Sequence, residues 1–423
     1  MALAAVLSIT SMRGADASQD PWFASQWNLR QINAPAAWAR STGAGVRIGI
    51  VDSGVLANHE DLAGKVVAAT DCFNTGGDPA ACHGSGLDDT GHGTHMAGVA
   101  AATKDNGRGI AGVAPDAELV VARVLTQNGG KIADVEAGIR WVVQHGAQVV
   151  NLSIGDNPMA QNPIDLSFTS AIEEAWAAGV IPVVTSGNTT SWGPARESFA
   201  KLDALVVGAT DDRGVVTRYS NGLSSAKWGV VAPGGAGTGD SHDVISTWRD
   251  PSAPDATSEY AYRGGTSVAA AEVSGVAALL LAEGLGPLDV VQRIVTTARP
   301  IACGIGCHGL VDAGAAVGPP GPRGVTVNGA GRAVAVSSQS SDSKGASPEA
   351  GAPGPPAVTP PGVSDATGVA APAVASATRA VARAIAGDGP RRDSTATWIA
   401  TALAAAIASA LIVERRYRAV AVP

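Results

Sequence analysis

Apolar runs of strand length alternate with segments of helical periodicity over residues 20–317, and this alternation restricts the fold more than any other feature of the chain. Buried strands that are separated by helices are typical of a mostly parallel sheet covered by helices on both faces. The sequence therefore predicts an α/β fold, with a doubly wound, mostly parallel central sheet and helices on both faces. The expected strands are residues 46–51, 119–124, 149–153, 180–185 and 205–209.

Three helices are expected between and after these strands. Apolar residues recur at helical spacing over 132–142, and residues 170–178 form a second pattern that Gly179 closes. The long apolar run at 266–282 is predicted to be a buried helix rather than a membrane span, because it carries Glu272 and follows a turn. The main domain is expected to cover residues 18–317.

The N-terminal residues 1–17 resemble an incomplete export signal. A short apolar stretch precedes Ala15-Asp16-Ala17, a small-residue cleavage pattern, but the usual basic segment is missing. We expect the natural start to lie further upstream and the mature, exported chain to begin near Ser18.

The composition changes beyond residue 317. Residues 318–392 are rich in Pro, Ala, Gly and Ser, and are expected to form a disordered linker that cannot bury enough apolar surface to fold. Residues 397–413 are uncharged and of the minimum length for a transmembrane helix, and the basic residues of 414–423 then predict a short cytoplasmic tail. This places the main domain on the extracytoplasmic face of a membrane. An alanine-rich soluble helix is the alternative.

Charge and cysteine content narrow the function classes. The formal net charge of -8 offers no basic face for nucleic acid. The four cysteines fall into two locally spaced pairs, which favours short disulfide-closed loops in an oxidising compartment. A zinc site that uses the same cysteines with neighbouring histidines is an alternative. The favoured pairs are Cys72 with Cys82 and Cys303 with Cys307.

Three residues at the ends of predicted elements could activate a nucleophile. Ser267 lies in Gly-Thr-Ser-Val-Ala at the start of the apolar helix, where the helix dipole favours negative charge. His92, in Thr-Gly-His-Gly-Thr-His, is the candidate base, and Asp52 follows a strand directly. Because catalytic groups gather at the carboxyl ends of parallel strands, we expect the three to meet. Asn188, at another strand end, is a candidate oxyanion donor.

The motifs around Asp52, His92, Asn188 and Ser267, in this order, resemble those of the subtilase (subtilisin-like, S8-type) family of serine peptidases. The resemblance implies peptide-bond hydrolysis through an acyl-enzyme with an Asp/His/Ser triad, a polypeptide substrate and a monomeric peptidase domain. It also implies substrate-binding segments, one of which pairs with the substrate backbone: Ser153, Ile154 and Gly155, with Ser186 and Gly187. The layout with a proline-rich segment before a terminal span is similar to that of mycosins.

Two residues beyond the nucleophile depart from the family pattern. Ala271 stands where the family commonly has proline, and Glu272 where it often has histidine. We expect activity to be retained, because neither position replaces a triad group. A catalytically degenerate member that keeps the fold as a surface binding or scaffold module is the alternative function.

Calcium is the one cofactor that the resemblance suggests. Asp20, Asp61 and Asn106 occur where thermitase-like members place oxygen ligands, and their side chains are the hard donors that calcium prefers. His95, three residues after His92, could form a metal pair with it, but in the family this histidine is structural.

Overall fold

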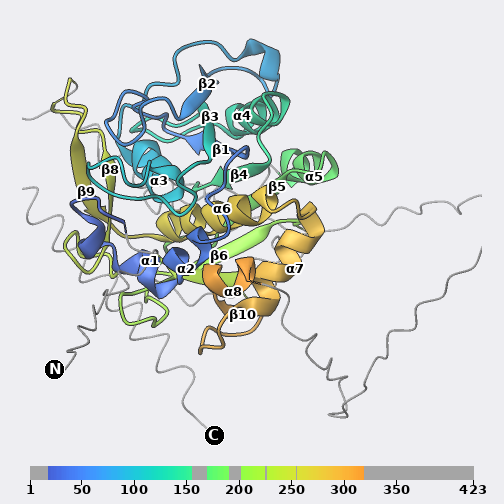
Figure 1. The fold of residues 1–423 in the computed structure, drawn as a ribbon. Helices are drawn as coiled ribbons and strands as arrows, with labels where there is room; N and C mark the ends of the chain where they lie inside the picture. The colour runs from blue at the N-terminus through green and yellow to red at the C-terminus, as the bar shows by residue number, and fades with distance from the viewer. Residues whose placement is uncertain (1–17, 155–168, 190–201, 224–225, 254, 319–423) are drawn as a thin grey trace, which may run out of the picture. The chain divides into compact units, whose positions relative to one another are not determined.

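The computed structural model describes residues 18–154, 169–189, 202–223, 226–253 and 255–318 (Figure 1). An eight-stranded sheet, parallel at every pairing, has the order β10-β7-β6-β5-β4-β1-β3-β2. Its strands are β1 Arg47–Asp52, β2 Val66–Asp71, β3 Glu118–Arg123, β4 Val149–Leu152, β5 Ile181–Thr185, β6 Leu205–Thr210, β7 Trp228–Pro233 and β10 Cys307–Leu310. The predicted parallel α/β sheet is confirmed.

An antiparallel hairpin, β8 Val244–Trp248 with β9 Glu259–Arg263, forms a separate two-stranded sheet. The helices are α1 Trp27–Gln31, α2 Ala34–Trp38, α3 His92–Ala101, α4 Ile132–Gln144, α5 Thr169–Ala177, α6 Thr266–Ala282, α7 Pro287–Thr297 and α8 Ala313–Val317, with short 3₁₀ turns η1 Phe23–Ser25 and η2 Pro79–Ala81. The predicted helix at 266–282 coincides with α6. No helix in the described part of the chain is long and apolar enough to cross a membrane.

Alternate residues of the central strands enter two cores on opposite faces of the sheet. Leu119 and Val121 of β3 belong to the core that α3 and α6 cover, whereas Val120 and Ala122 belong to the core that α4 and α5 cover. Helix α6 is buried along nearly its whole length. The catalytic candidate Ser267 therefore sits on an element that packing holds rigidly.

The strand order reverses at β1. From β1 the chain builds β2 and β3 on one side, and it then crosses back to place β4, β5, β6 and β7 on the other. In open parallel sheets, such a reversal leaves a crevice at the carboxyl ends of the strands. Asp52 ends β1 and Ser153 follows β4, so side chains from both arms of the sheet meet at this crevice.

Both disulfides join the pairs that sequence spacing favours, Cys72 with Cys82 and Cys303 with Cys307. The zinc alternative is wrong, because all four sulfurs are oxidised and cannot act as thiolate ligands. The predicted signal at 1–17, nearly all of the linker at 318–392, the span at 397–413 and the tail at 414–423 lie outside the described residues.

Candidate active site

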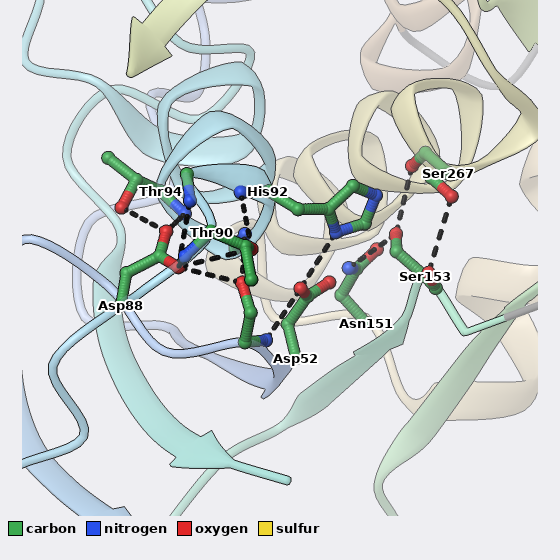
Figure 2. A network of polar contacts seen from close by, with 11 residues as sticks. Asp52, Asp88, Thr90, His92, Thr94, Asn151, Ser153 and Ser267 are labelled. Carbon is green, nitrogen blue, oxygen red and sulfur yellow. Dashed lines mark hydrogen bonds and ion pairs between the residues drawn. The ribbon is translucent and has the colours of Figure 1, made fainter. Parts of the chain in front are cut away.

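A carboxylate and an imidazole form a close pair at the end of β1. Asp52 is fully buried, and its Oδ1 lies 2.7 Å from Nδ1 of His92, the first residue of α3 (Figure 2). The backbone N–H of Ser53 donates to the same oxygen at 2.7 Å. The imidazole retains 40% of its side-chain exposure. The strand end thus fixes the carboxylate and directs it at a histidine that remains open to the cleft.

The surroundings of His92 favour its charged form. Burial lowers the pKa of His92, but the charge of Asp52, the hydrogen bond that His92 donates to Asp52 and the charge of Asp88 outweigh burial and raise this pKa above its ordinary value. Since Nδ1 donates to Asp52, Nε2 is the acceptor in the neutral imidazole. Figure 2 shows this second nitrogen turned toward Ser267.

Ser267 is the second residue of α6 and is held by a reciprocal contact with Ser153. Its Oγ donates to the Ser153 carbonyl at 3.2 Å, while Ser153 Oγ donates to the Ser267 carbonyl at 2.9 Å (Figure 2). Asn151 donates to Ser153 Oγ in turn, at 2.8 Å. In this state no hydrogen bond joins Ser267 and His92 among the described residues. The hydroxyl must therefore turn from Ser153 toward His92 before His92 can take its proton.

Asn188 lies just beyond β5, and its amide is oriented by the start of α6. Its Oδ1 accepts from Thr266 N at 2.9 Å and from Thr266 Oγ1 at 2.8 Å. A backbone N–H can only donate, so this contact assigns the oxygen to the helix side and leaves Nδ2 on the other. Because Asn188 lines the cleft beside Ser267, this Nδ2 is a donor next to the nucleophile.

Sequence reasoning missed Asp88, a fully buried carboxylate that organises the approach to His92. It accepts from Ser53 Oγ at 2.8 Å, from the backbone N–H groups of Thr90 and Gly91 at 2.9 and 3.0 Å, and from Thr94 Oγ1 at 2.6 Å (Figure 2). These bonds tie the turn after β1 to the start of α3. Its only sequence signal is a position four residues before His92, in a loop of small and polar residues.

A cavity of about 520 Å³ opens at the carboxyl ends of the strands. The four catalytic candidates line it together with Ser153 and Ile154. Its other wall comes from the loop after β3, which sequence reasoning did not single out, although a polar, glycine-containing segment after a predicted strand is a signal for such a role. That wall consists of Leu125, Thr126, Gln127, Gly129 and Gly130.

The remaining substrate-binding candidates are placed differently. Gly155 lies outside the described residues. Ser186 and Gly187 follow β5, but neither lines this cavity or the smaller one beside it. Gly187 has φ 99°, and a Cβ there would lie 2.6 Å from Nδ2 of Asn221, so glycine is required for the turn that leads to Asn188.

His95 takes part in a structural contact between α3 and the β8–β9 hairpin. It is fully buried on α3, and its Nε2 lies 3.2 and 3.1 Å from the carbonyl oxygens of Val244 and Ala261. Burial lowers the pKa of His95 to about 3, so the ring stays neutral and links α3 to the β8–β9 hairpin. No group of three His, Cys, Asp or Glu residues in the described part is placed to hold a metal.

The three calcium candidates converge on one loop, but hydrogen-bond donors occupy their oxygens. Asp61 accepts from Asn106 Nδ2 at 2.8 Å and from Ile110 N at 2.9 Å. Asp20 accepts from the N–H groups of Asp105 and Gly107 at 2.8 and 3.1 Å. In this arrangement the amide of Asn106 presents its donor to Asp61, and the residues do not fit an open calcium site.

Comparison with known proteins agrees with this geometry. The sequence profile of the Subtilase family matches residues 43–329. The chain is 35% identical over 285 residues to thermitase of Thermoactinomyces vulgaris, which covers 67% of this chain and 92% of thermitase. It is 34% identical over 265 residues to subtilisin DY of Bacillus licheniformis, which covers 60% of this chain and 84% of that protein.

A solved protease structure from Pseudoalteromonas arctica superimposes with a TM-score of 0.61 and 29% identity, and the match covers 71% of this chain and 98% of that one. The resemblance noted at the catalytic motifs thus extends over residues 43–329. The chain belongs to the subtilase family and is a serine-type endopeptidase.

Proposed function

We propose that Asp52, His92 and Ser267 form the catalytic triad of this endopeptidase. The observation that carries the proposal is the 2.7 Å bond between Asp52 and His92, whose other ring nitrogen is turned toward Ser267 (Figure 2). Ser267 Oγ attacks the peptide carbonyl while His92 takes its proton and returns it to the leaving amine. Asp52 holds the imidazole in the correct tautomer and stabilises its charged form.

Asn188 is proposed as one half of the oxyanion hole, with the backbone N–H of Ser267 as the other. Its amide is already fixed by Thr266, so it needs no reorganisation as charge develops on the substrate oxygen. The acyl side of the polypeptide is expected to lie along Ser153, Ile154 and Gly155, with backbone pairing as the resemblance implies.

Labelling with a fluorophosphonate probe tests the triad. We expect covalent labelling of the folded wild-type protein and none of Ser267→Ala, while the exposed-serine control Ser252→Ala labels normally. Labelling that persists in Ser267→Ala would exclude Ser267 as the nucleophile. A folded wild-type protein that never labels would favour the binding or scaffold module over the enzyme.

Export and membrane attachment are part of the same proposal. The sequence of residues 1–17 and 397–413 supports a secreted domain that is tethered through a single C-terminal helix, with the C-terminus in the cytoplasm. Removal of the chain from residue 397 onward should release the peptidase from membranes without detergent. Membrane association that survives this truncation would contradict the tether. The likeness in layout to mycosins rests on these same segments.

Calcium binding stays a prediction from the resemblance alone. A bound ion would have to displace the donors that now face Asp20 and Asp61. A melting temperature that falls on chelation and recovers with added calcium would support it. A melting temperature that chelation leaves unchanged would contradict calcium binding.

A further inference from the structure

A second cavity of about 230 Å³ adjoins the nucleophile. It shares His92, Asn188 and Ser267 with the larger cavity, but it lacks Ser153 and Ile154 and is walled by Trp248 and Arg263 instead. The two cavities thus diverge from the reacting serine. If the acyl part of the substrate follows Ser153 and Ile154, the leaving-group part enters the second cavity.

Arg263 ends β9 and is the exposed cation of this second cavity. Its guanidinium carbon lies 4.3 Å from the centroid of the Trp248 ring, on the neighbouring strand β8. This cation–π contact orders the side chain without neutralising its charge. A guanidinium that is already ordered loses less entropy when it binds a planar anion.

No carboxylate of the described residues lies within ion-pair distance of Arg263, whereas Arg213 is paired with Asp211 at 2.6 Å and Arg140 with Glu174 at 2.6 Å. The acidic residue just before the hairpin, Asp243, is buried and accepts from the N–H of Gly237 at 2.6 Å.

Other titratable groups in the second cavity leave Arg263 as its principal charge. His95 is neutral, because burial lowers its pKa to about 3 and the charge of Arg263 adds to this effect. His92 must be neutral to act as the base. The leaving-group cavity therefore carries one standing positive charge next to the nucleophile.

We propose that Arg263 is a specificity-determining residue that selects a carboxylate on the leaving-group side of the scissile bond. The carboxylate belongs to an acidic side chain just after that bond or to the free C-terminus of a short leaving peptide. Arginine and carboxylate match in a planar, two-bond geometry. The inference rests on the proposed acyl-enzyme mechanism and assigns a substrate class to it.

Capture of the acyl-enzyme by added amines tests this proposal. A peptide ester first acylates Ser267. The nitrogen of the added amine then attacks the acyl carbon, the bond from that carbon to Oγ breaks, and His92 moves the amine proton to Oγ. Three of the amines are dipeptide amides in which aspartate, asparagine or lysine comes first and carries the attacking amino group, and alanine amide follows. The other two are alanylalanine with a free C-terminus and alanylalanine with an amidated C-terminus. For each variant, the yield of the aminolysis product is divided by the yield of ester hydrolysis by that same variant.

We expect the aspartyl amine to be captured about tenfold better than the asparaginyl amine at low salt, as befits a charge-assisted contact at an exposed site. Arg263→Gln should remove this preference, so that the aspartyl and asparaginyl amines are captured equally. Arg263→Glu should instead favour the lysyl amine. Comparison of the free and amidated alanylalanine shows whether a terminal carboxylate is also selected.

The control Arg213→Glu makes the same charge change as Arg263→Glu, but at a residue that lines neither cavity. It should leave the relative capture of all the amines as in the wild type. Equal capture of all amines by the wild type, or ratios that do not respond to Arg263→Gln, would overturn this proposal alone. Absence of ester hydrolysis that depends on Ser267 would overturn the proposed function as well.

Discussion

Asn28 and Glu272 are joined inside the protein by one short hydrogen bond, in which Asn28 Nδ2 donates to Glu272 Oε1 at 2.6 Å. Both side chains are buried, and among the described residues neither the second carboxyl oxygen, Glu272 Oε2, nor the amide oxygen, Asn28 Oδ1, has a hydrogen-bond partner. Burial raises the pKa of Glu272 to about 8, whereas the bond from Asn28 opposes this rise. At neutral pH the folded state therefore favours the protonated carboxyl, which avoids an unpaired charge in the interior.

The first prediction concerns the pH dependence of stability. Between the ordinary pKa of 4.5 and the folded value of about 8, the folded state holds a proton on Glu272 that the unfolded state has lost. This group therefore makes the free energy of unfolding fall as pH rises through that window, by about 1.4 kcal/mol per pH unit, and its effect levels off above pH 8. Glu272→Gln should remove this component, because glutamine supplies both a donor and an acceptor at every pH.

Urea unfolding at intervals from pH 5 to pH 9 measures the difference between the two proteins. Neighbouring elements carry Arg30 on α1, His92 and His95 on α3, Asp243 before β8, and Asp289 and Arg293 on α7, but none of them shifts the pKa of Glu272. The exposed control Glu173→Gln should keep the wild-type profile. Parallel profiles for the wild type and Glu272→Gln would show that Glu272 is ionised in the folded state.

The second prediction concerns the base. Since His92 must lose its proton to act, kcat should rise with pH, with a midpoint above the ordinary value of 6.5. Asp52→Asn removes the main charge that raises the pKa of His92, and it should move this midpoint to lower pH and reduce kcat by about 10⁴-fold. The pH profile of kcat for both proteins is the measurement. A midpoint that Asp52→Asn leaves in place would argue against the pairing of these residues as the active base.

The third prediction separates the two contacts of Asn188. Asn188→Asp keeps the acceptor that binds Thr266 but replaces the donor that faces the cleft. It should lower kcat by about 10²- to 10³-fold, change KM less and leave the melting temperature close to that of the wild type. Asn188→Ala should lose both contacts and also destabilise the protein. Full turnover by Asn188→Asp would exclude its amide from the oxyanion hole.

The fourth prediction concerns Asp88. Asp88→Ala leaves the hydroxyl donors of Ser53 and Thr94 and three backbone N–H groups, those of Thr90, Gly91 and Thr94, without their buried acceptor. It should destabilise the protein by about 2–4 kcal/mol. Chemical unfolding measures this loss. Asp116→Ala, at an exposed acidic position, should cost little by comparison. A loss for Asp88→Ala no larger than that control would mean that the network adds no stability.

Local patterns predicted the parts of the fold that depend on residues near one another in the chain. Five central strands and the helices α4, α5 and α6 were predicted close to their observed bounds, because each presents an apolar run or a 3.6-residue repeat. The edge strand β2 was not predicted, since its residues are mostly half-buried. Nor were the short strand β10, the strand β7 and the hairpin of β8 and β9 predicted.

The sequence by itself indicated the fold class and the four catalytic candidates and favoured the observed disulfide pairs, because these reside in runs and motifs of a few adjacent residues. Only the tertiary structure decided which residues face them. Asn28 and Glu272 are 244 residues apart, and Asp88 acts by joining the turn after β1 to α3. Arg263 lies over the Trp248 ring because β9 pairs with β8. Such contacts depend on how elements that are distant in the chain pack against one another, and the spacing of residues along the sequence does not reveal that packing.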